Sequence, residues 1–251
     1  MKTKHAKSKH RRGKRKSKKC FKKSLRFLGV NSAGLRPKMK TFKKVIKEQE
    51  TKYKDTGKIK VENYDIFELV RKNKDGGGLA LGCLKELQAA WVREGDDLVE
   101  ALSVEIIVKN MKIRCCVAYG CQENDSVERK DEFWNYLDEE VYLADQRGTG
   151  FMLQFDGNLW AGPDLIPGDP RPQNKNGKLF QNFLNRNPHL TVVNALPLCE
   201  GLITRSRIKG DKEERSVLDF FVICSRLLPF LKSMVIVIQI IIQNILTLIF
   251  K

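Results

Sequence analysis

Short apolar runs alternate with polar breaks along most of this chain, a pattern that predicts a domain rich in strands. Two runs of β-branched residues, Leu102–Val108 and Ile113–Tyr119, flank Lys109–Lys112, which predicts a hairpin that delivers Tyr119 to a strand end. Gly150–Asn158 predicts a buried strand that closes on Asp156, Gly157 and Asn158. A carboxylate and an amide in such a position are held rigidly at the rim of a sheet.

Further strands are expected where other apolar runs end in a polar residue. These extended segments are Ser24–Asn31, Lys58–Phe67, Leu79–Leu84, Leu190–Asn194 and Val217–Cys224. The last is apolar on both faces apart from Asp219, and a lone acid there is costly unless it is paired. We therefore expect Asp219 to have a dedicated partner. Gly76–Gly78 predict a turn and not a phosphate loop, because no Gly-Lys-Ser/Thr follows them.

Three segments have helical spacing of their apolar residues. Lys38–Glu50 predicts a short amphipathic helix, and Gly177–Asn187 predicts another. Between them, Asp125 resembles an N-cap with Glu128 three residues on, opening a helix whose aromatic and aliphatic residues fall on one face. The Pro/Gly/Asn-rich stretch Trp160–Asn176 predicts a loop, too polar for a core and long enough to be functional.

Positive charge is concentrated at the N-terminus. Of the 47 Lys and Arg, thirteen fall in residues 1–24, which contain no acid, so 34 bases remain to set against 30 acids. Such a segment cannot bury enough apolar surface to order itself, so we expect a disordered basic arm. The arm is a solvated segment, a nuclear localisation signal or a nucleic-acid contact. Its charge favours a nuclear over a cytoplasmic location for the protein.

Cysteine usage and the C-terminal run complete the domain picture. The seven cysteines show no Cys-x-x-Cys spacing, which favours a reducing compartment and argues against zinc. Met234–Phe250 holds thirteen apolar residues in seventeen. As a helix it would span roughly 25 Å, short of the ~30 Å hydrocarbon core, so a membrane anchor, a buried strand and an aggregation-prone end all stay open. We expect an arm at 1–24, one domain at 25–233 and an apolar tail at 234–251.

Polar residues recur in a distinctive order at the ends of these segments. They are Asn31, Glu50 within Gln49-Glu50-Thr51, Tyr119, Asp156 and Asn158, Asn194, and Asp219 within Ser216-Val-Leu-Asp219. With this ordered set the chain, from about Leu25 to Met234, resembles the endonuclease/exonuclease/phosphatase family. Within it, the chain is most similar to the endonuclease domains of non-LTR retrotransposons, relatives of apurinic endonucleases and deoxyribonuclease I. Taken singly, each residue also has a plain structural interpretation, as a turn, a surface position or a strand cap.

The resemblance implies a fold and a metal. The fold is an α/β four-layer sandwich of two packed mixed β-sheets flanked by helices. The reaction is hydrolysis of DNA phosphodiester bonds with Mg²⁺, or Mn²⁺ in its place. Glu50, helped by the amide oxygen of Asn31, would hold the metal, since Mg²⁺ prefers oxygen ligands and keeps several waters.

The resemblance also implies roles for the remaining residues. Asp156 would align or deprotonate the attacking water, and Asn158 would donate a hydrogen bond to the phosphoryl oxygens. Tyr119 would contact the phosphate or the leaving group. Asn194 and Thr204 would support the site and the substrate strand, and Asp219 would match the acid that orients the family's catalytic histidine.

The sequence departs from the family pattern at two points. No apolar strand precedes Glu50, and no histidine follows His189. We therefore expect a fold that lacks one inner strand and the final catalytic strand, and an enzyme that is weak or inactive, since members of a concerted site act as a unit. The alternative is a non-catalytic nucleic-acid-binding protein that uses the basic arm. DNA is the expected partner, RNA is not separated from it, and a membrane enters only if the tail inserts.

Overall fold

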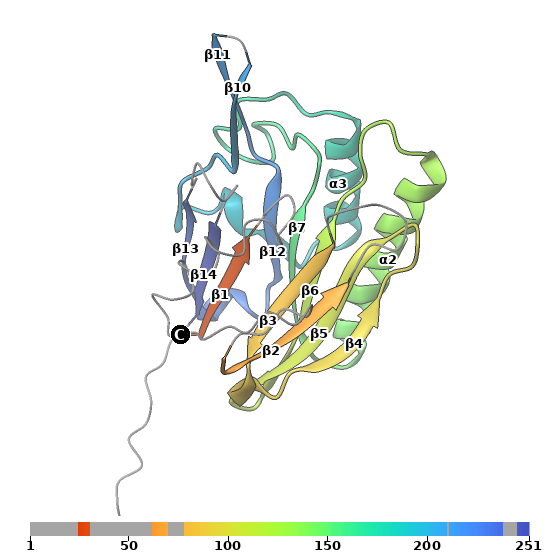
Figure 1. The fold of residues 1–251 in the computed structure, drawn as a ribbon, viewed down its shortest axis with the longest axis vertical. Helices are drawn as coiled ribbons and strands as arrows, with labels where there is room; N and C mark the ends of the chain where they lie inside the picture. Colours follow the sequence, from red (N-terminus) through yellow and green to blue (C-terminus); the bar gives the residue numbers. More distant parts are fainter. Residues whose placement is uncertain (1–24, 31–61, 70–77, 210, 238–244, 251) are drawn as a thin grey trace, which may run out of the picture.

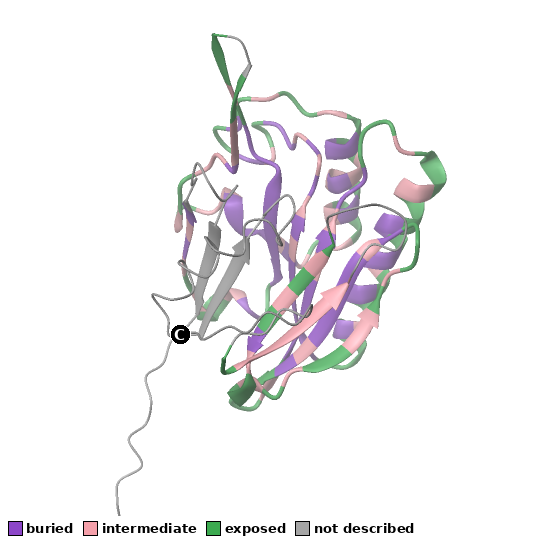
Figure 2. Cartoon of the chain, viewed as in Figure 1, coloured by how far each residue is buried: buried purple, intermediate pink, exposed green. Residues whose placement is uncertain are grey.

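The computed structural model describes residues 25–30, 62–69, 78–209, 211–237 and 245–250. Its centre is a six-stranded mixed sheet with the strand order β4-β5-β6-β7-β12-β8 (Figure 1). The strands are β4 Ala90–Glu94, β5 Glu100–Val108, β6 Met111–Tyr119, β7 Gly150–Asp156, β12 Asp219–Cys224 and β8 Leu190–Val192. β12 is buried along its whole length (Figure 2), as expected for a strand covered on both faces.

The predicted hairpin is confirmed, with a tighter turn than expected. β5 and β6 pair antiparallel from Glu100 opposite Tyr119 to Val108 opposite Met111. Only two residues make the turn, and Lys109 has a φ of 57°, the left-handed conformation that two-residue hairpins need. Met111 and Lys112 therefore belong to the strand.

Helix α2, Val127–Gln146, crosses from β6 to the parallel strand β7 and covers one face of the sheet (Figure 1). The predicted cap was wrong by one residue, because Ser126 accepts the hydrogen bond from Arg129 N at 3.2 Å. Asp125 instead accepts a hydrogen bond from Gln122 N at 2.7 Å, in the turn before the helix. The aromatic and aliphatic face predicted for this helix is buried, as expected of core.

Helix α3, Lys175–Arg186, lies beside α2 and begins two residues before the predicted start. Asn174 caps it, with its side-chain oxygen accepting a hydrogen bond from Gly177 N at 2.8 Å. Rings from both helices and from the sheet pack with centroids 5.1 to 6.3 Å apart, and the group consists of Phe133, Trp134, Phe155, Phe180, Phe183 and Phe220. This aromatic cluster fixes the helical layer to β7 and β12.

A second β-layer consists of a four-stranded sheet, ordered β1-β14-β13-β9, and of a separate hairpin, β2-β3. The bounds are β1 Leu25–Val30, β14 Ile245–Phe250, β13 Leu231–Val237, β9 Cys199–Glu200, β2 Tyr64–Leu69 and β3 Leu79–Leu84. The β2-β3 hairpin packs on β5 and β6 (Figure 1), and Met234 of β13 is fully buried in the main core. The predicted α/β class with two packed mixed sheets and flanking helices is confirmed.

Several boundaries differ from the sequence-based ones. Of the extended segment expected at 58–67, residues 58–61 lie outside the described residues, and strand β2 begins at Tyr64 after a turn at Glu62 and Asn63. The segment Leu190–Asn194 ends as a strand at Val192, followed by a 3₁₀ turn over Val193–Ala195. The described parts of 234–251 are strands β13 and β14, and within the described ranges no helix is long and apolar enough to cross a membrane. The helix expected at Lys38–Glu50 lies outside the described residues.

Two charged side chains are buried between α2 and the sheet. Glu140 of α2 is fully buried and accepts a hydrogen bond from the hydroxyl of Ser103 on β5. Arg114 of β6 is 2% exposed, and its Nε lies 3.0 Å from Glu140 Oε2 as an ion pair, although the angle is not that of a good hydrogen bond. Removing either partner would leave the other charge buried and uncompensated, so breaking this pair is costly in free energy.

Candidate active site

Three of the predicted residues meet in one row at a single edge of the main sheet. The ladder between β6 and β7 places Tyr119 beside Asp156, and the ladder between β7 and β12 places Asp219 beside Asp156. Neighbouring strands lie about 4.8 Å apart and partners in register point to the same face. β6 and β7 end at this edge and β12 begins there, so residues separated by a hundred positions in sequence form one row about 10 Å long.

The turn after β7 is fixed by Asn158. Its backbone N–H donates to Asp156 Oδ1 at 3.2 Å, and its side-chain amide donates to the carbonyl of Gly120 at 2.8 Å. Asn158 adopts a φ of +46°, which few residues other than glycine and asparagine tolerate. The end of β7 is thereby tied to the end of β6, and the second N–H of the amide has a fixed direction.

Close packing explains the glycine between the two polar residues. Gly157 N donates to Leu218 O at 2.6 Å, and a Cβ at this position would lie 2.9 Å from the side chain of Leu159 and 3.0 Å from the ring of Phe220. The backbone here approaches its neighbours more closely than any side chain would permit. Asp156-Gly157-Asn158 is thus a tightly constrained corner.

Two buried polar residues bind the backbone of Asp219. Thr204, fully buried, accepts hydrogen bonds on Oγ1 from Leu218 N at 2.8 Å and from Asp219 N at 3.0 Å. Asn194 donates to Asp219 O at 3.1 Å and accepts from Phe221 N at 2.9 Å. The family resemblance implies that Thr204 and Asn194 support the site and the substrate strand, and in the structure both bind the backbone around Asp219.

Truncating Asn194 tests this support. The Asn194→Ala variant removes the hydrogen bonds that the amide makes in the core to the N–H of Phe221 and to the carbonyl of Asp219. We expect it to lower the free energy of unfolding by about 1–3 kcal/mol, measured by urea denaturation. Asn185→Ala is the matched control, because that amide is on the surface of α3 and bonds only to Gln181 among the contacts described, at 3.1 Å. Equal effects of the two substitutions would contradict the assigned support.

Some residues of this edge were not predicted from the sequence. Glu100, at the start of β5, extends the row because it pairs in register with Tyr119. Gln122 donates to the hydroxyl of Tyr119 at 3.1 Å. Asn176 of α3 is buried and donates to Cys121 O at 2.8 Å and to Asn158 O at 3.4 Å, so it joins the loops that follow β6 and β7. Counting the hairpin register from its turn could have found Glu100; no local signal points to Asn176.

The predicted metal ligands Glu50 and Asn31 lie outside the described residues. Within the described ranges, no group of three or more His, Cys, Asp or Glu is arranged to hold a metal ion. The carboxylates of Asp156 and Asp219 are of the oxygen type that Mg²⁺ prefers, but Asp219 is 2% exposed and the side-chain oxygen of Asn194 is bound to a backbone N–H. The described residues do not by themselves make a magnesium site.

Histidine and cysteine do not contribute to this edge. His189 precedes β8, its Nε2 lies 3.1 Å from Asp145 Oδ2, and its carbonyl accepts from Ser225 N beyond the far end of β12. That is about 20 Å from Asp219 along the six residues of the strand. Burial raises the pKa of Cys115 and Cys116, so these thiols stay protonated and behave as core residues.

Comparison with solved structures finds the same architecture in nucleic-acid enzymes. The AP endonuclease LMAP from Leishmania major aligns with a TM-score of 0.67 at 15% identity, covering 91% of this chain and 88% of that one. The 3′ phosphatase NExo from Neisseria, bound to a product DNA hairpin, aligns at 0.65 and 14% identity over 90% and 99% of the two chains. The chain has the endonuclease/exonuclease/phosphatase fold.

The endonuclease domain of TRAS1, a telomere-specific non-LTR retrotransposon, has this fold too. It aligns with a TM-score of 0.53 at 14% identity, over 76% of this chain and 81% of that one. No family model and no curated protein matches the sequence. At such identities the likeness establishes the endonuclease/exonuclease/phosphatase fold, which agrees with the resemblance drawn from the ordered polar residues, and the chemistry has to be argued from the site.

Proposed function

We propose that this chain binds DNA at the edge formed by β6, β7 and β12 and hydrolyses phosphodiester bonds there at a low rate. The observation that carries the proposal is the row of Tyr119, Asp156 and Asp219 in mutual register, with Asn158 anchored at its corner. Two carboxylates and a phenol at one sheet edge supply a base, a charge and a hydrogen-bond donor, which are the groups that a hydrolytic site requires. The fold, shared with DNA-processing enzymes, supports this choice of substrate.

Each residue has a role that its position permits. Asp156 is half-buried at the end of β7, where it can orient a water for attack on phosphorus. The second N–H of the Asn158 amide can donate to a phosphoryl oxygen, with its direction set by the bond to Gly120. Tyr119 can bind the phosphate or the leaving oxygen. A divalent cation, for which Glu50 and Asn31 are the proposed ligands, would supply charge neutralisation at the phosphate.

The low rate follows from the lack of a histidine in the described part of this edge. The single histidine in the described ranges, His189, lies at the opposite end of the sheet. Asp219 therefore has no histidine to orient among these residues, although its backbone is firmly held. Since members of a concerted site act together, losing one removes several powers of ten in rate.

A plasmid-nicking assay tests the proposal. We expect slow, Mg²⁺-dependent or Mn²⁺-dependent conversion of supercoiled DNA to the nicked form, and none with EDTA. DNA binding is measured in parallel by fluorescence anisotropy. Nicking that persists in EDTA would contradict the metal dependence. Binding without any nicking would instead favour the second function, a non-catalytic nucleic-acid-binding protein, which the absence of histidine from the described edge also supports.

A further inference from the structure

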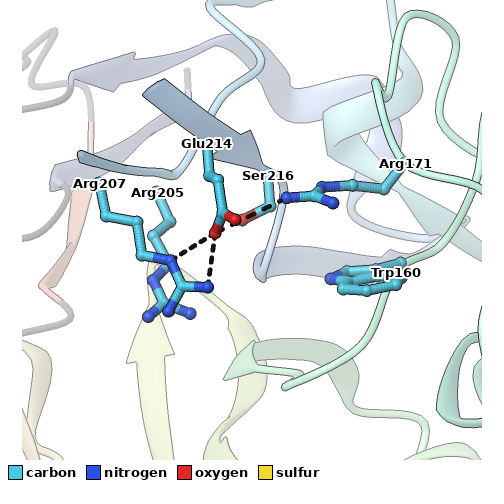
Figure 3. A pocket seen from close by; sticks show the side chains of 6 residues that line it. All are labelled: Trp160, Arg171, Arg205, Arg207, Glu214 and Ser216. Carbon is cyan, nitrogen blue, oxygen red and sulfur yellow. Dashed lines mark hydrogen bonds and ion pairs between the residues drawn. The ribbon is translucent and has the colours of Figure 1, made fainter. Parts of the chain in front are cut away.

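A small pocket lined by three arginines lies beside the proposed active site, between the hairpin β10-β11 and the loop after β7. The hairpin strands are β10 Arg205–Lys209 and β11 Lys212–Ser216, and they project beyond the end of the main sheet (Figure 1). The pocket has a volume of about 40 Å³ and is lined by Trp160, Arg171, Arg205, Arg207, Glu214 and Ser216 (Figure 3). Three guanidinium groups around one small hollow are an unusual concentration of positive charge and need an anionic partner.

Strand alternation places these residues on one face of the hairpin. Arg205 pairs in register with Ser216 and Arg207 with Glu214, so all four point toward the loop. The intervening residues make a separate set of contacts on the other face, where Glu213 binds Arg215 at 2.9 Å and Ser206 at 2.5 Å. The two faces thus carry the same residue types with different surroundings.

The carboxylate of Glu214 occupies the centre of the arginine group. Arg207 donates a hydrogen bond from Nε to Glu214 Oε2 at 2.6 Å, and its Nη2 lies 2.5 Å from the same oxygen as an ion pair. Arg171 Nη2 lies 3.9 Å from that oxygen. Figure 3 shows Arg207 and Arg171 reaching this carboxylate from opposite sides. Arg171 also lies over the ring of Trp160, 5.1 Å from its centroid, which holds its guanidinium in place.

The pocket and the active site share their supporting segments. Arg205 directly follows Thr204, the residue that binds Asp219 N, and Thr204 N donates to Ser216 O at 3.1 Å. Trp160 is two residues beyond Asn158. When the scissile phosphate of a DNA strand lies at Asp156, a neighbouring phosphate of the same strand would therefore lie at the pocket.

We propose that Arg171, Arg205 and Arg207 form a phosphate subsite for the DNA strand next to the scissile bond, and that Glu214 holds this subsite closed until a phosphate displaces it. The inference rests on the proposed function, because it takes the substrate from there. A carboxylate and a phosphate present the same acceptor oxygens to an arginine fork, so one can replace the other. At about 40 Å³ the pocket is far smaller than the roughly 300 Å³ or more that small-molecule ligands require, which favours a single phosphate of a longer strand.

The hairpin itself offers matched variants for the test. Arg207→Gln and Arg215→Gln remove one positive charge each, from the pocket face and from the other face. Binding of the full chain to a fluorescein-labelled DNA duplex is measured by anisotropy over a range of salt concentrations. We expect Arg207→Gln to weaken binding about tenfold and to reduce the slope of log K against log salt by ~0.9, the value of one lost phosphate contact, while Arg215→Gln changes affinity less than about twofold.

A substitution at Glu214 should change DNA affinity in the opposite direction. Glu214→Gln should tighten binding about threefold or more, because the internal competitor loses its charge, whereas Glu213→Gln should leave it nearly unchanged. Melting temperatures confirm that the variants are folded. Equal effects of Arg207→Gln and Arg215→Gln, or weaker binding by Glu214→Gln, would overturn the subsite while binding and nicking by the wild type still supported the proposed function. A wild type that binds no DNA would overturn both.

Discussion

Replacing Asp156 with asparagine should abolish the nicking activity while leaving the fold in place. The substitution keeps the size of the side chain and an oxygen that can still accept the hydrogen bond from Asn158 N, so the corner at 156–158 should persist. The charge and the basic oxygen are lost. Removing a general base costs about 10²–10⁴ in rate. We therefore expect the nicked product to fall to the background of the assay, with a melting temperature close to that of the wild type.

Asp96→Asn is the matched control for this experiment. Asp96 accepts hydrogen bonds from Leu98 N at 2.9 Å and Val99 N at 3.1 Å, so it closes a turn after β4 much as Asp156 closes the turn after β7. The two strands are three steps apart in the sheet, about 14 Å. Asp96→Asn should keep full nicking. Equal rates for Asp156→Asn and the wild type would remove Asp156 from the reaction and would move the site away from this edge.

The sequence predicted the members of the site better than their geometry. Tyr119, Asp156 and Asp219 were each found as polar residues ending or interrupting an apolar run, a signal that is local. Their alignment in one row depends on the parallel crossover through α2 and on the pairing of β12 with β7, which are long-range choices of register. Local patterns do not fix such registers, because a slip by two residues keeps the same apolar residues of each strand facing the core.

Helix starts were misplaced for a similar reason. Asp125 and Ser126 are both good capping residues, and the choice between them depends on the turn that binds Asp125 to Gln122. Asn176 was missed because a polar residue in the first turn of a helix resembles any surface residue, while its partners, Cys121 O and Asn158 O, come from distant loops. One local signal was overlooked. Arg114 is a lone charge within the apolar run Ile113–Tyr119, and the cost of burying it required an acid such as Glu140 nearby.

That buried pair supports the second large prediction, which concerns stability and not chemistry. Glu140→Ala leaves the guanidinium of Arg114 buried without its acid and removes the acceptor for the Ser103 hydroxyl. Breaking a buried ion pair by removing one partner costs about 3–5 kcal/mol, a large part of the ~5–15 kcal/mol that stabilises a domain. We expect a fall of that size in the free energy of unfolding, measured by urea denaturation.

Glu139, next to Glu140 in the helix, is the control that separates the effect of burial from the effect of removing a charge. Glu139 binds Arg93 at 2.7 Å, but its side chain is 53% exposed, so Glu139→Ala should cost no more than about 1 kcal/mol. A double variant, Glu140→Ala with Arg114→Leu, should recover part of the loss, because no unpaired charge then remains in the core. If Glu140→Ala and Glu139→Ala cost the same, or if Arg114→Leu deepens the defect of Glu140→Ala, then the Arg114–Glu140 pair does not stabilise the packing of α2 on the sheet.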